Sequence, residues 1–322
     1  MPTFAGPPFD PELDAVLTAL AANVPPTITP AMIERFRAIA PDPTVGGLVE
    51  QVGAVHDRRT IVGFADADID VSVFRHERRQ GVGPGILYLH GGGMIFGNRF
   101  GGVGAYLPFV ASHGAVVIAV DYRLAPEHPD PIPVEDCFAA LAWMAANARE
   151  LGIDPGRLVV AGQSAGAGLA AGITLLARER GGPGVLAQLL VSPMLDDRND
   201  TVSAHQIDGV GVWDRTSNDT GWTALLGERR GGDDVTDASA PGRAVDLGGL
   251  PRAFLSVGSA EVFRDETVAW ASALWAAGVQ AELHVWPGAF HGSTSMMPGA
   301  TLSRRAVTAL RDWTGRLLDP TP

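Results

Sequence analysis

The stretch RLVVAGQSAGAGLAAG, residues 157–172, places a serine between two glycines at the end of an apolar run. The run RLVVAG (157–162) is short and rich in valine and leucine, which predicts a buried strand. Alanine and leucine dominate the residues that follow, which predicts a helix over 165–179. Ser164 therefore falls on a sharp turn from strand to helix. There the glycines remove side chains that would collide, and the hydroxyl is left exposed.

Apolar runs of the same kind recur on both sides of this turn. They predict largely buried strands, and polar alternation predicts one half-buried strand at 69–73. The buried strands expected are 85–90, 115–120, 157–162, 187–192, 253–258 and 281–286. Helical patterns separate these runs at 135–150, 165–179, 266–277 and 302–317. Strands that alternate with helices predict an α/β fold, in which a mostly parallel central sheet has helices on both faces.

Two regions interrupt this alternation. The N-terminal region is helix-like and rich in proline, and a later region combines turn residues with Trp213 and Trp222, which look exposed. We interpret both regions as a helical cap over one face of the sheet. The expected organisation is N-terminal cap helices over 1–55, a core over 56–194 and 251–322, and a second cap segment over 195–250.

The composition excludes several classes of protein. The formal net charge is -12, and all 24 basic residues are arginine because the sequence contains no lysine. Chemistry that needs a lysine, such as Schiff-base formation or a P-loop, is therefore excluded. An acidic chain without a basic stripe is not expected to bind nucleic acid. The single cysteine, Cys137, rules out disulfides within the chain and cysteine zinc sites, and we expect it in the core.

The sequence offers no pattern for a membrane span, a metal or an organic cofactor. No apolar run approaches the roughly 18 residues that a membrane helix needs, and the N-terminus has no basic leader, so we expect a cytoplasmic protein. Asp66, Asp68, Asp70 and Glu77 imitate a calcium loop, but Val71 stands where the loop needs glycine, which favours a strand. No G-x-G-x-x-G follows a strand, so a dinucleotide site has no support either.

A second glycine cluster, HGGG at 90–93, follows the expected strand 85–90. Consecutive glycines let backbone N–H groups point into a cavity without obstruction, as stabilisation of a negatively charged oxygen requires. We interpret the N–H groups of Gly92, Gly93 and Ala165 as an oxyanion hole. His90, at the strand end, is expected to fix this loop through hydrogen bonds.

An activated serine needs a base, and the sequence contains eight histidines. His291 is favoured because it follows the last strand across a Pro-Gly-Ala-Phe turn, in the chain order nucleophile, acid, histidine. His284 lies inside that strand and is expected to be structural. His205, in the second cap segment, is a candidate for lining the substrate site.

The acid that orients the base should follow the strand 253–258 directly. Glu261 is favoured because it is nearest to the strand end. Asp265 and Glu266 fit better in the first turn of the next helix, where carboxylates interact favourably with the helix dipole. By location alone, the candidate substrate-binding residues are Met94, Phe96, Phe100, His205, Trp213 and Trp222.

Taken together, these motifs resemble the hormone-sensitive-lipase-like (bacterial family IV) esterases of the α/β-hydrolase superfamily. The resemblance extends over HGGG (90–93), DYRLAPEHP (121–129), GQSAG (162–166), SPMLDDR (192–198), EVFRDE (261–266) and FHG (290–292). It implies the α/β-hydrolase fold with a cap, no metal or organic cofactor, and a preference for short acyl esters. GQSAGAGLAAG and DDRNDTVS are also similar to bacterial acetylesterases of the heroin-esterase type.

The chain departs from the family pattern at two positions. Gln163 stands before the nucleophile where the family often has aspartate, which removes a charge beside Ser164. Glu261 begins the acid motif where the family usually has aspartate. The fold accepts either carboxylate as the acid, so the assignment of Glu261 stays.

The expected function is that of a serine carboxylester hydrolase in which Ser164, His291 and Glu261 form the catalytic triad. The alternatives are a ligand-binding receptor that has lost its chemistry and a lyase or dehydratase that uses the same pocket. Retention of the serine, the histidine and the acid argues against the receptor. The expected partner is a small-molecule ester, and the oligomeric state, a homodimer included, is left open.

Overall fold

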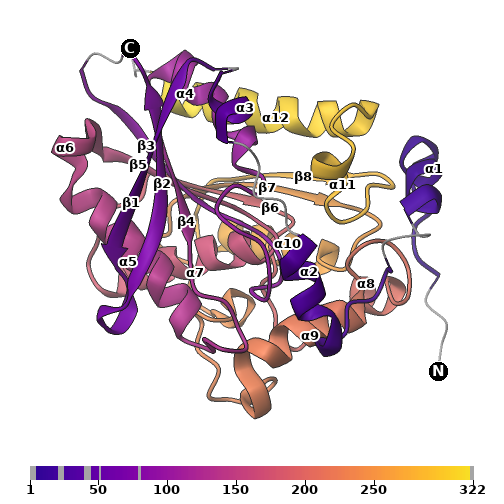
Figure 1. The fold of residues 1–322 in the computed structure, drawn as a ribbon. Coiled ribbons are helices and arrows are strands. Elements are labelled where there is room, and N and C mark those ends of the chain that lie inside the picture. The colour runs from indigo at the N-terminus through magenta and orange to yellow at the C-terminus, as the bar shows by residue number, and fades with distance from the viewer. Residues whose placement is uncertain (1–4, 21–24, 40–44, 51, 79–80, 320–322) are drawn as a thin grey trace.

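The architecture was obtained as a computed structural model that describes residues 5–20, 25–39, 45–50, 52–78 and 81–319. Its centre is one eight-stranded sheet with the order β1-β2-β4-β3-β5-β6-β7-β8 (Figure 1). β2 runs antiparallel to β1 and β4, and every other neighbouring pair is parallel. The strands are β1 Ala54–Val62, β2 Asp68–His76, β3 Gly83–Leu89, β4 Val116–Asp121, β5 Ile153–Gln163, β6 Ala187–Val191, β7 Arg252–Gly258 and β8 Ala281–Trp286.

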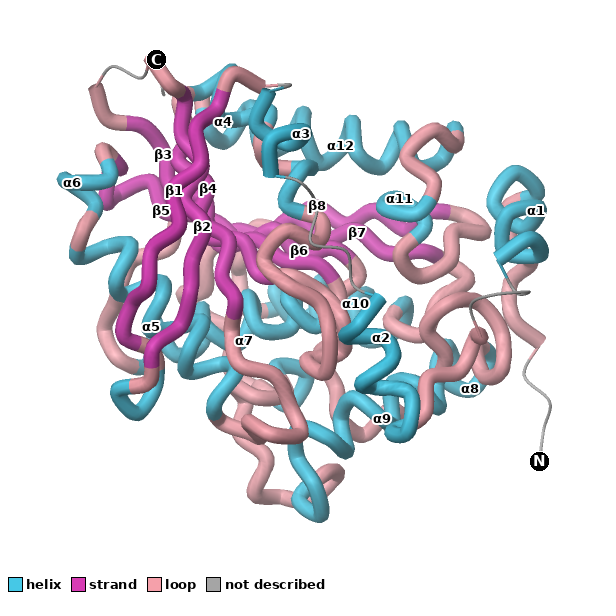
Figure 2. Tube along the Cα trace, in the orientation of Figure 1, coloured by secondary structure: helices cyan, strands magenta, loops and turns pink. Residues whose placement is uncertain are grey.

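Helices cover both faces of this sheet, as Figure 2 shows. One layer contains α5 (Ile132–Ala146), α7 (Ala165–Glu179) and α10 (Arg264–Ala276), and the other contains α4 (Pro108–His113) and α12 (Thr301–Leu318). The remaining helices are α1 Pro11–Leu20, α2 Ile33–Ile39, α3 Val45–Glu50, α6 Ala148–Leu151, α8 Val202–Gln206, α9 Arg215–Leu226 and α11 Ser293–Met296. Short 3-10 turns lie at Pro30–Met32, Phe64–Asp66, Val103–Ala105, Gly227–Arg229 and Pro241–Arg243. The α/β fold with a mostly parallel sheet is confirmed.

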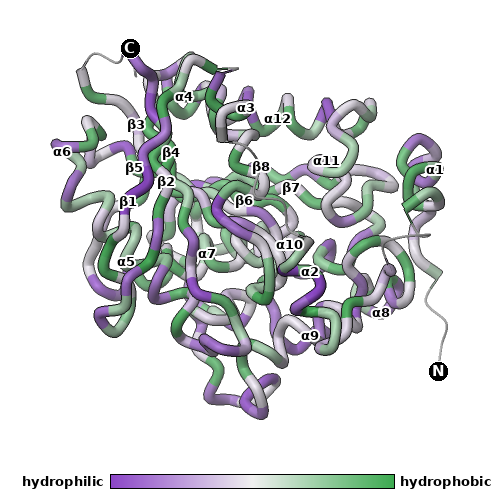
Figure 3. Tube along the Cα trace, in the orientation of Figure 1, coloured by the Kyte–Doolittle hydropathy of each residue, from purple (hydrophilic) through white to green (hydrophobic). Residues whose placement is uncertain are grey.

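The central strands are apolar because both of their faces are buried. In β3, Leu87 and Leu89 pack in the core on the side of α5 and α7, whereas Ile86 and Tyr88 pack in the core on the side of α4 and α12. The middle of the molecule is accordingly hydrophobic along the chain trace (Figure 3). Cys137 lies fully buried in α5, as expected. Parallel strands between two helix layers need no polar alternation, which is why the sequence predicted them well.

The two edge strands are where expectation and structure differ. The sequence predicted β8 as a largely buried strand, and this was wrong. Among the residues that the structure describes, β8 pairs only with β7, and all of its residues are partly or fully exposed. β1 was not predicted at all, because AVHDRRTIV carries three charged residues and lacks apolar alternation. It forms nonetheless, by pairing with β2 along nine residues at the other edge. Because an edge strand buries less surface, it needs fewer apolar residues, and the hydrophobic pattern of the sequence predicts it less well.

The N-terminal segment packs against the segment that follows β6. Thr27 Oγ1 donates a 2.5 Å hydrogen bond to Asp214, and the N–H of Ile28 donates to Ser217 Oγ at 2.8 Å. The expectation that Trp213 and Trp222 are exposed was wrong, because their side chains are 4% and 0% exposed. Both rings belong to the main hydrophobic core, which also contains Ile28 and Ile33 of the N-terminal segment. Among the described segments, none of the helices combines the length and the apolar character that a membrane crossing requires.

Candidate active site

Ser164 lies at the turn between β5 and α7, as the sequence predicted. Its backbone angles are φ 59° and ψ -125°, which place it in the left-handed region that side chains rarely adopt. A Cβ atom on Gly162 would come within 2.2 Å of the carbonyl oxygen of Gly166, and one on Gly166 within 2.1 Å of that of Leu89. The sharp turn therefore closes only because both neighbouring positions are glycine.

Ser164, His291 and Glu261 form a continuous hydrogen-bonded chain. His291 Nε2 lies 3.0 Å from Ser164 Oγ, and His291 Nδ1 lies 3.2 Å from Glu261 Oε1. The side chains are buried, and the ring of Phe263 contacts the imidazole edge to face at 5.0 Å. Because a carboxylate only accepts hydrogen bonds, Nδ1 carries the proton and Nε2 is left to accept one from the serine hydroxyl. This geometry can activate Ser164 as a nucleophile.

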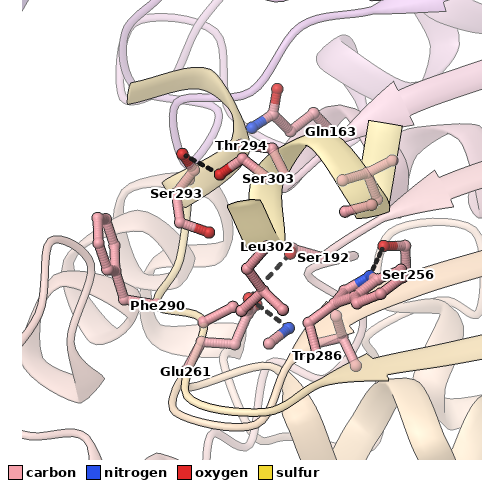
Figure 4. Close-up of a pocket in the computed structure, with 16 residues that line it drawn as sticks. Gln163, Ser192, Ser256, Glu261, Trp286, Phe290, Ser293, Thr294, Leu302 and Ser303 are labelled. Atoms are coloured by element: carbon pink, nitrogen blue, oxygen red, sulfur yellow. Dashed lines mark hydrogen bonds between the residues drawn. The ribbon is translucent and has the colours of Figure 1, made fainter. Parts of the chain in front are cut away.

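The carboxylate of Glu261 is held at both oxygens. Oε1 faces the imidazole, and Oε2 accepts hydrogen bonds from the N–H of Gly258 at 2.9 Å and from Ser192 Oγ at 3.0 Å (Figure 4). These two donors satisfy the second oxygen of this buried side chain and fix the direction in which the carboxylate faces.

The neighbouring carboxylates have other partners. Asp265 Oδ2 accepts the N–H of Ser203 at 2.7 Å, and Glu266 Oε1 accepts that of Leu195 at 2.8 Å. Burial raises the pKa of Glu266 well above its ordinary value of 4.5. Burial also raises the pKa of Asp265, but hydrogen bonds from Arg264 and Ser203 together outweigh that effect and leave it lowered. Both side chains stand in the first turn of α10, as the sequence predicted.

The glycine loop after β3 runs beside the serine. A Cβ atom on Gly91 would lie 3.1 Å from Ser164 Cβ, and the carbonyl of Gly92 closes the turn by accepting the N–H groups of Ile95 and Phe96. In the described part of the chain, no acceptor takes a hydrogen bond from the N–H of Gly92 or Gly93. Ala165 begins α7, so its N–H has no acceptor within the helix. These three amides are available as donors.

The other histidines singled out in the sequence have structural contacts. His90 Nδ1 lies 2.7 Å from the carbonyl oxygen of Gly91, and its ring stacks on Tyr122 at 4.2 Å. Burial lowers the pKa of His90. His284 Nε2 lies 2.8 Å from Glu282 Oε1 in β8. His205 is exposed on α8, where Nε2 lies 2.8 Å from Asp200 Oδ1.

The remaining candidate substrate residues lie at different depths. Met94 is buried beside the glycine loop, and Trp222 is fully buried in the hydrophobic core. Trp213 covers the loop directly, because a Cβ atom on Gly93 would lie 2.3 Å from its ring. Phe96 contacts the edge of Trp213 with ring centroids 6.1 Å apart. Phe100 lines a groove of about 790 Å³ between the 100–106 loop and α12.

Gln163, the departure beside the nucleophile, reaches into that same groove. Its side-chain amide lies 3.2 Å from the Oγ atom of Ser295. Ser295 is on α11, the short helix that directly follows the loop carrying His291. The two loops that carry the serine and the histidine are therefore joined by a hydrogen bond between neutral groups. Sequence reasoning did not find Ser192, because a serine before a proline at a strand end is ordinary and only its contact with Glu261 distinguishes it.

Comparisons with known proteins agree with this architecture. A family model described as "alpha/beta hydrolase fold" matches residues 86–295. The carboxylesterase NlhH of Mycobacterium tuberculosis is 36% identical over 94% of this chain and 96% of its own length. An acetyl-hydrolase of Streptomyces hygroscopicus is 33% identical over 70% of this chain and 73% of its own length. Among solved structures, a bacterial heroin esterase superposes with a TM-score of 0.89 at 36% identity, covering 97% of this chain and 98% of that one.

Proposed function

Because the chain belongs to the alpha/beta hydrolase fold family, in its hormone-sensitive-lipase-like branch, and is an ester-hydrolysing enzyme, we propose that Ser164, His291 and Glu261 are its catalytic triad. One observation carries the proposal: the hydrogen-bonded chain from Ser164 Oγ through both ring nitrogens of His291 to the buried Glu261. The strained backbone at Ser164 supports it, since such strain is concentrated at functional sites.

In the first half of the reaction, Ser164 Oγ attacks the ester carbonyl carbon while His291 Nε2 takes the hydroxyl proton. The carbonyl oxygen becomes an oxyanion, which the N–H groups of Gly92, Gly93 and Ala165 stabilise. The bond from carbon to the alcohol oxygen then breaks, and His291 returns the proton to the departing alcohol. The acyl group remains on the serine. Glu261 keeps Nδ1 protonated and stabilises the imidazolium throughout.

In the second half, water attacks the acyl-enzyme carbonyl and gives its proton to His291. The tetrahedral intermediate collapses, the bond to Ser164 Oγ breaks, and the serine oxygen recovers the proton. The acid product leaves, and the enzyme returns to its starting state. Every step uses side chains or amides of this chain, and none calls for a metal or an organic cofactor.

We propose short-acyl esters as substrates, with the segments 1–55 and 195–250 as a cap over the 56–194 and 251–322 core. The buried ring of Trp213 lies on Gly93 and against Phe96, which limits the space beside the oxyanion hole. Similarity to an acetyl-hydrolase points in the same direction. Phe96, Phe100, His205 and Trp213 are then expected to act on binding and not on chemistry, whereas Trp222, which is fully buried in the core, is expected to support the fold.

A panel of p-nitrophenyl esters from acetate to palmitate tests this proposal. We expect kcat/KM to be highest between acetate and hexanoate, and we expect the chelator EDTA to leave it unchanged. Ser164→Ala should remove nearly all activity while the circular dichroism spectrum stays that of the wild type. Near-normal turnover by Ser164→Ala, or a preference for palmitate, would contradict the proposal.

A further inference from the structure

Ser192, directly after β6, occupies a backbone conformation that favours glycine. Its φ is 47°, in the left-handed region, and its side chain is buried at 7% exposure. The N–H of Ser192 donates to the carbonyl oxygen of Ser256 in β7 at 2.7 Å, which ties the strained residue to the neighbouring strand. Serine in place of glycine adds a hydroxyl at this position and adds backbone strain with it.

The hydroxyl is directed at the acid of the triad. Ser192 Oγ lies 3.0 Å from Glu261 Oε2 (Figure 4). The other oxygen, Oε1, is the one near His291. The N–H of Gly258 donates to the same oxygen at 2.9 Å from another direction. Two donors on Oε2 fix the rotation of the carboxylate and hold Oε1 toward the imidazole, 3.2 Å from Nδ1.

A glutamate needs this restraint more than an aspartate does. Its side chain has one more rotatable bond, and the last torsion, which turns the carboxylate, is only broadly restricted. A small cavity of about 20 Å³, the size of one water molecule, borders both Glu261 and Ser192. Ser256 also borders the cavity, but its hydroxyl accepts the indole N–H of Trp286 at 2.9 Å.

We propose that Ser192 is a positioning residue for ester hydrolysis. Its hydroxyl holds the Glu261 carboxylate in the orientation that hydrogen-bonds His291, and the backbone strain at Ser192 accompanies this role. This inference rests on the proposed triad. It predicts that the loss of catalysis follows the loss of the hydroxyl, which glycine and alanine share, and not the loss of stability, which differs between them. If the role of Ser192 were merely structural, kcat would fall in step with stability across the two variants.

The test compares Ser192→Gly and Ser192→Ala with wild type in p-nitrophenyl acetate hydrolysis and thermal unfolding. Both variants should lose about tenfold or more in kcat with KM little changed, the size expected for one hydrogen bond to a charged group. Ser192→Gly should unfold at a higher temperature than Ser192→Ala, because both lose the hydroxyl but glycine also relieves the positive φ. Ser256→Ala is the matched control: it removes a buried hydroxyl from the same cavity wall and should keep wild-type kcat.

A double-mutant cycle with Glu261→Gln completes the test. If Ser192 acts through the carboxylate, Ser192→Ala should not lower the residual kcat of Glu261→Gln any further. Wild-type kcat in Ser192→Gly, additive losses in the cycle, or an equal loss in Ser256→Ala would overturn the inference. Ser164→Ala in the same assay separates the outcomes, because its activity decides the proposed triad independently of Ser192.

Discussion

Replacing Glu261 with glutamine is expected to disable the base by changing the tautomer of His291. The amide has nearly the same shape as the carboxylate, but one oxygen becomes an NH₂ group. Gly258 and Ser192 both donate to Oε2, at 2.9 and 3.0 Å, so the amide oxygen is best accommodated there. The NH₂ group then faces Nδ1 of His291 and donates to it. The ring proton moves to Nε2, which can no longer accept the proton of Ser164.

The size of the expected loss in kcat follows from this change of tautomer. In a serine protease, the corresponding change from acid to amide lowers kcat by roughly 10⁴, which is about 5.5 kcal/mol of transition-state stabilisation. We expect a loss of this order for Glu261→Gln, with KM little changed, measured as p-nitrophenyl acetate hydrolysis under saturation. The fold should persist, because the amide keeps a hydrogen bond at each position.

Asp265→Asn is the matched control, since Asp265 is a nearby carboxylate with different hydrogen-bond partners. It accepts hydrogen bonds from the N–H of Ser203 and from Arg264, so the variant should lose stability and at most a few-fold in kcat. A loss of thousands of fold in Asp265→Asn with near-normal turnover in Glu261→Gln would show that the orienting acid was assigned to the wrong residue.

Three further outcomes can be checked by unfolding measurements. Burial raises the pKa of Glu266 well above 4.5 in the folded state. The contribution of Glu266 to the free energy of unfolding is therefore complete below pH 4.5 and is lost as pH rises through the folded-state pKa. Because glutamine does not titrate, Glu266→Gln should raise Tm at pH 8 more than at pH 5. Gly166→Ala should lower the free energy of unfolding by about 3 kcal/mol or more in urea titration, because its methyl group would lie 2.1 Å from the carbonyl oxygen of Leu89. Trp213→Ala should lower the free energy of unfolding by about 3–5 kcal/mol in the same titration, because the ring is buried. It should also lower kcat, because the ring packs on Gly93 in the glycine loop; an unchanged kcat would show that the loop does not need this contact.

The central strands and the Ser164 turn could be predicted because local sequence determines them. The runs that became β3, β5 and β7 have mostly apolar and buried centres, since helices cover both faces, and GQSAG has glycine where only glycine fits. β1 could not be predicted in the same way. Its pairing with β2 depends on the partner strand, and its own charged residues face solvent.

Burial in the region after β6 could not be inferred from local composition. Trp213 and Trp222 lie among polar and turn residues, which makes them look exposed, yet each is buried where distant segments meet. For Trp213 the decisive neighbour is Gly93, 120 positions earlier in the chain, whose missing side chain leaves room for the ring. The contact of Ser192 with Glu261 is likewise visible only in three dimensions.

The most direct test of the triad is to identify the residue that an inhibitor of activated serines modifies covalently. The protein would be inactivated with a fluorophosphonate, which labels activated serines, and then digested and analysed by mass spectrometry. We expect one adduct per chain, on the peptide that contains Ser164, with loss of esterase activity in proportion. Labelling should be abolished in Ser164→Ala and slowed strongly in His291→Ala. An adduct on another residue with Ser164 unmodified in the inactivated enzyme would contradict the account.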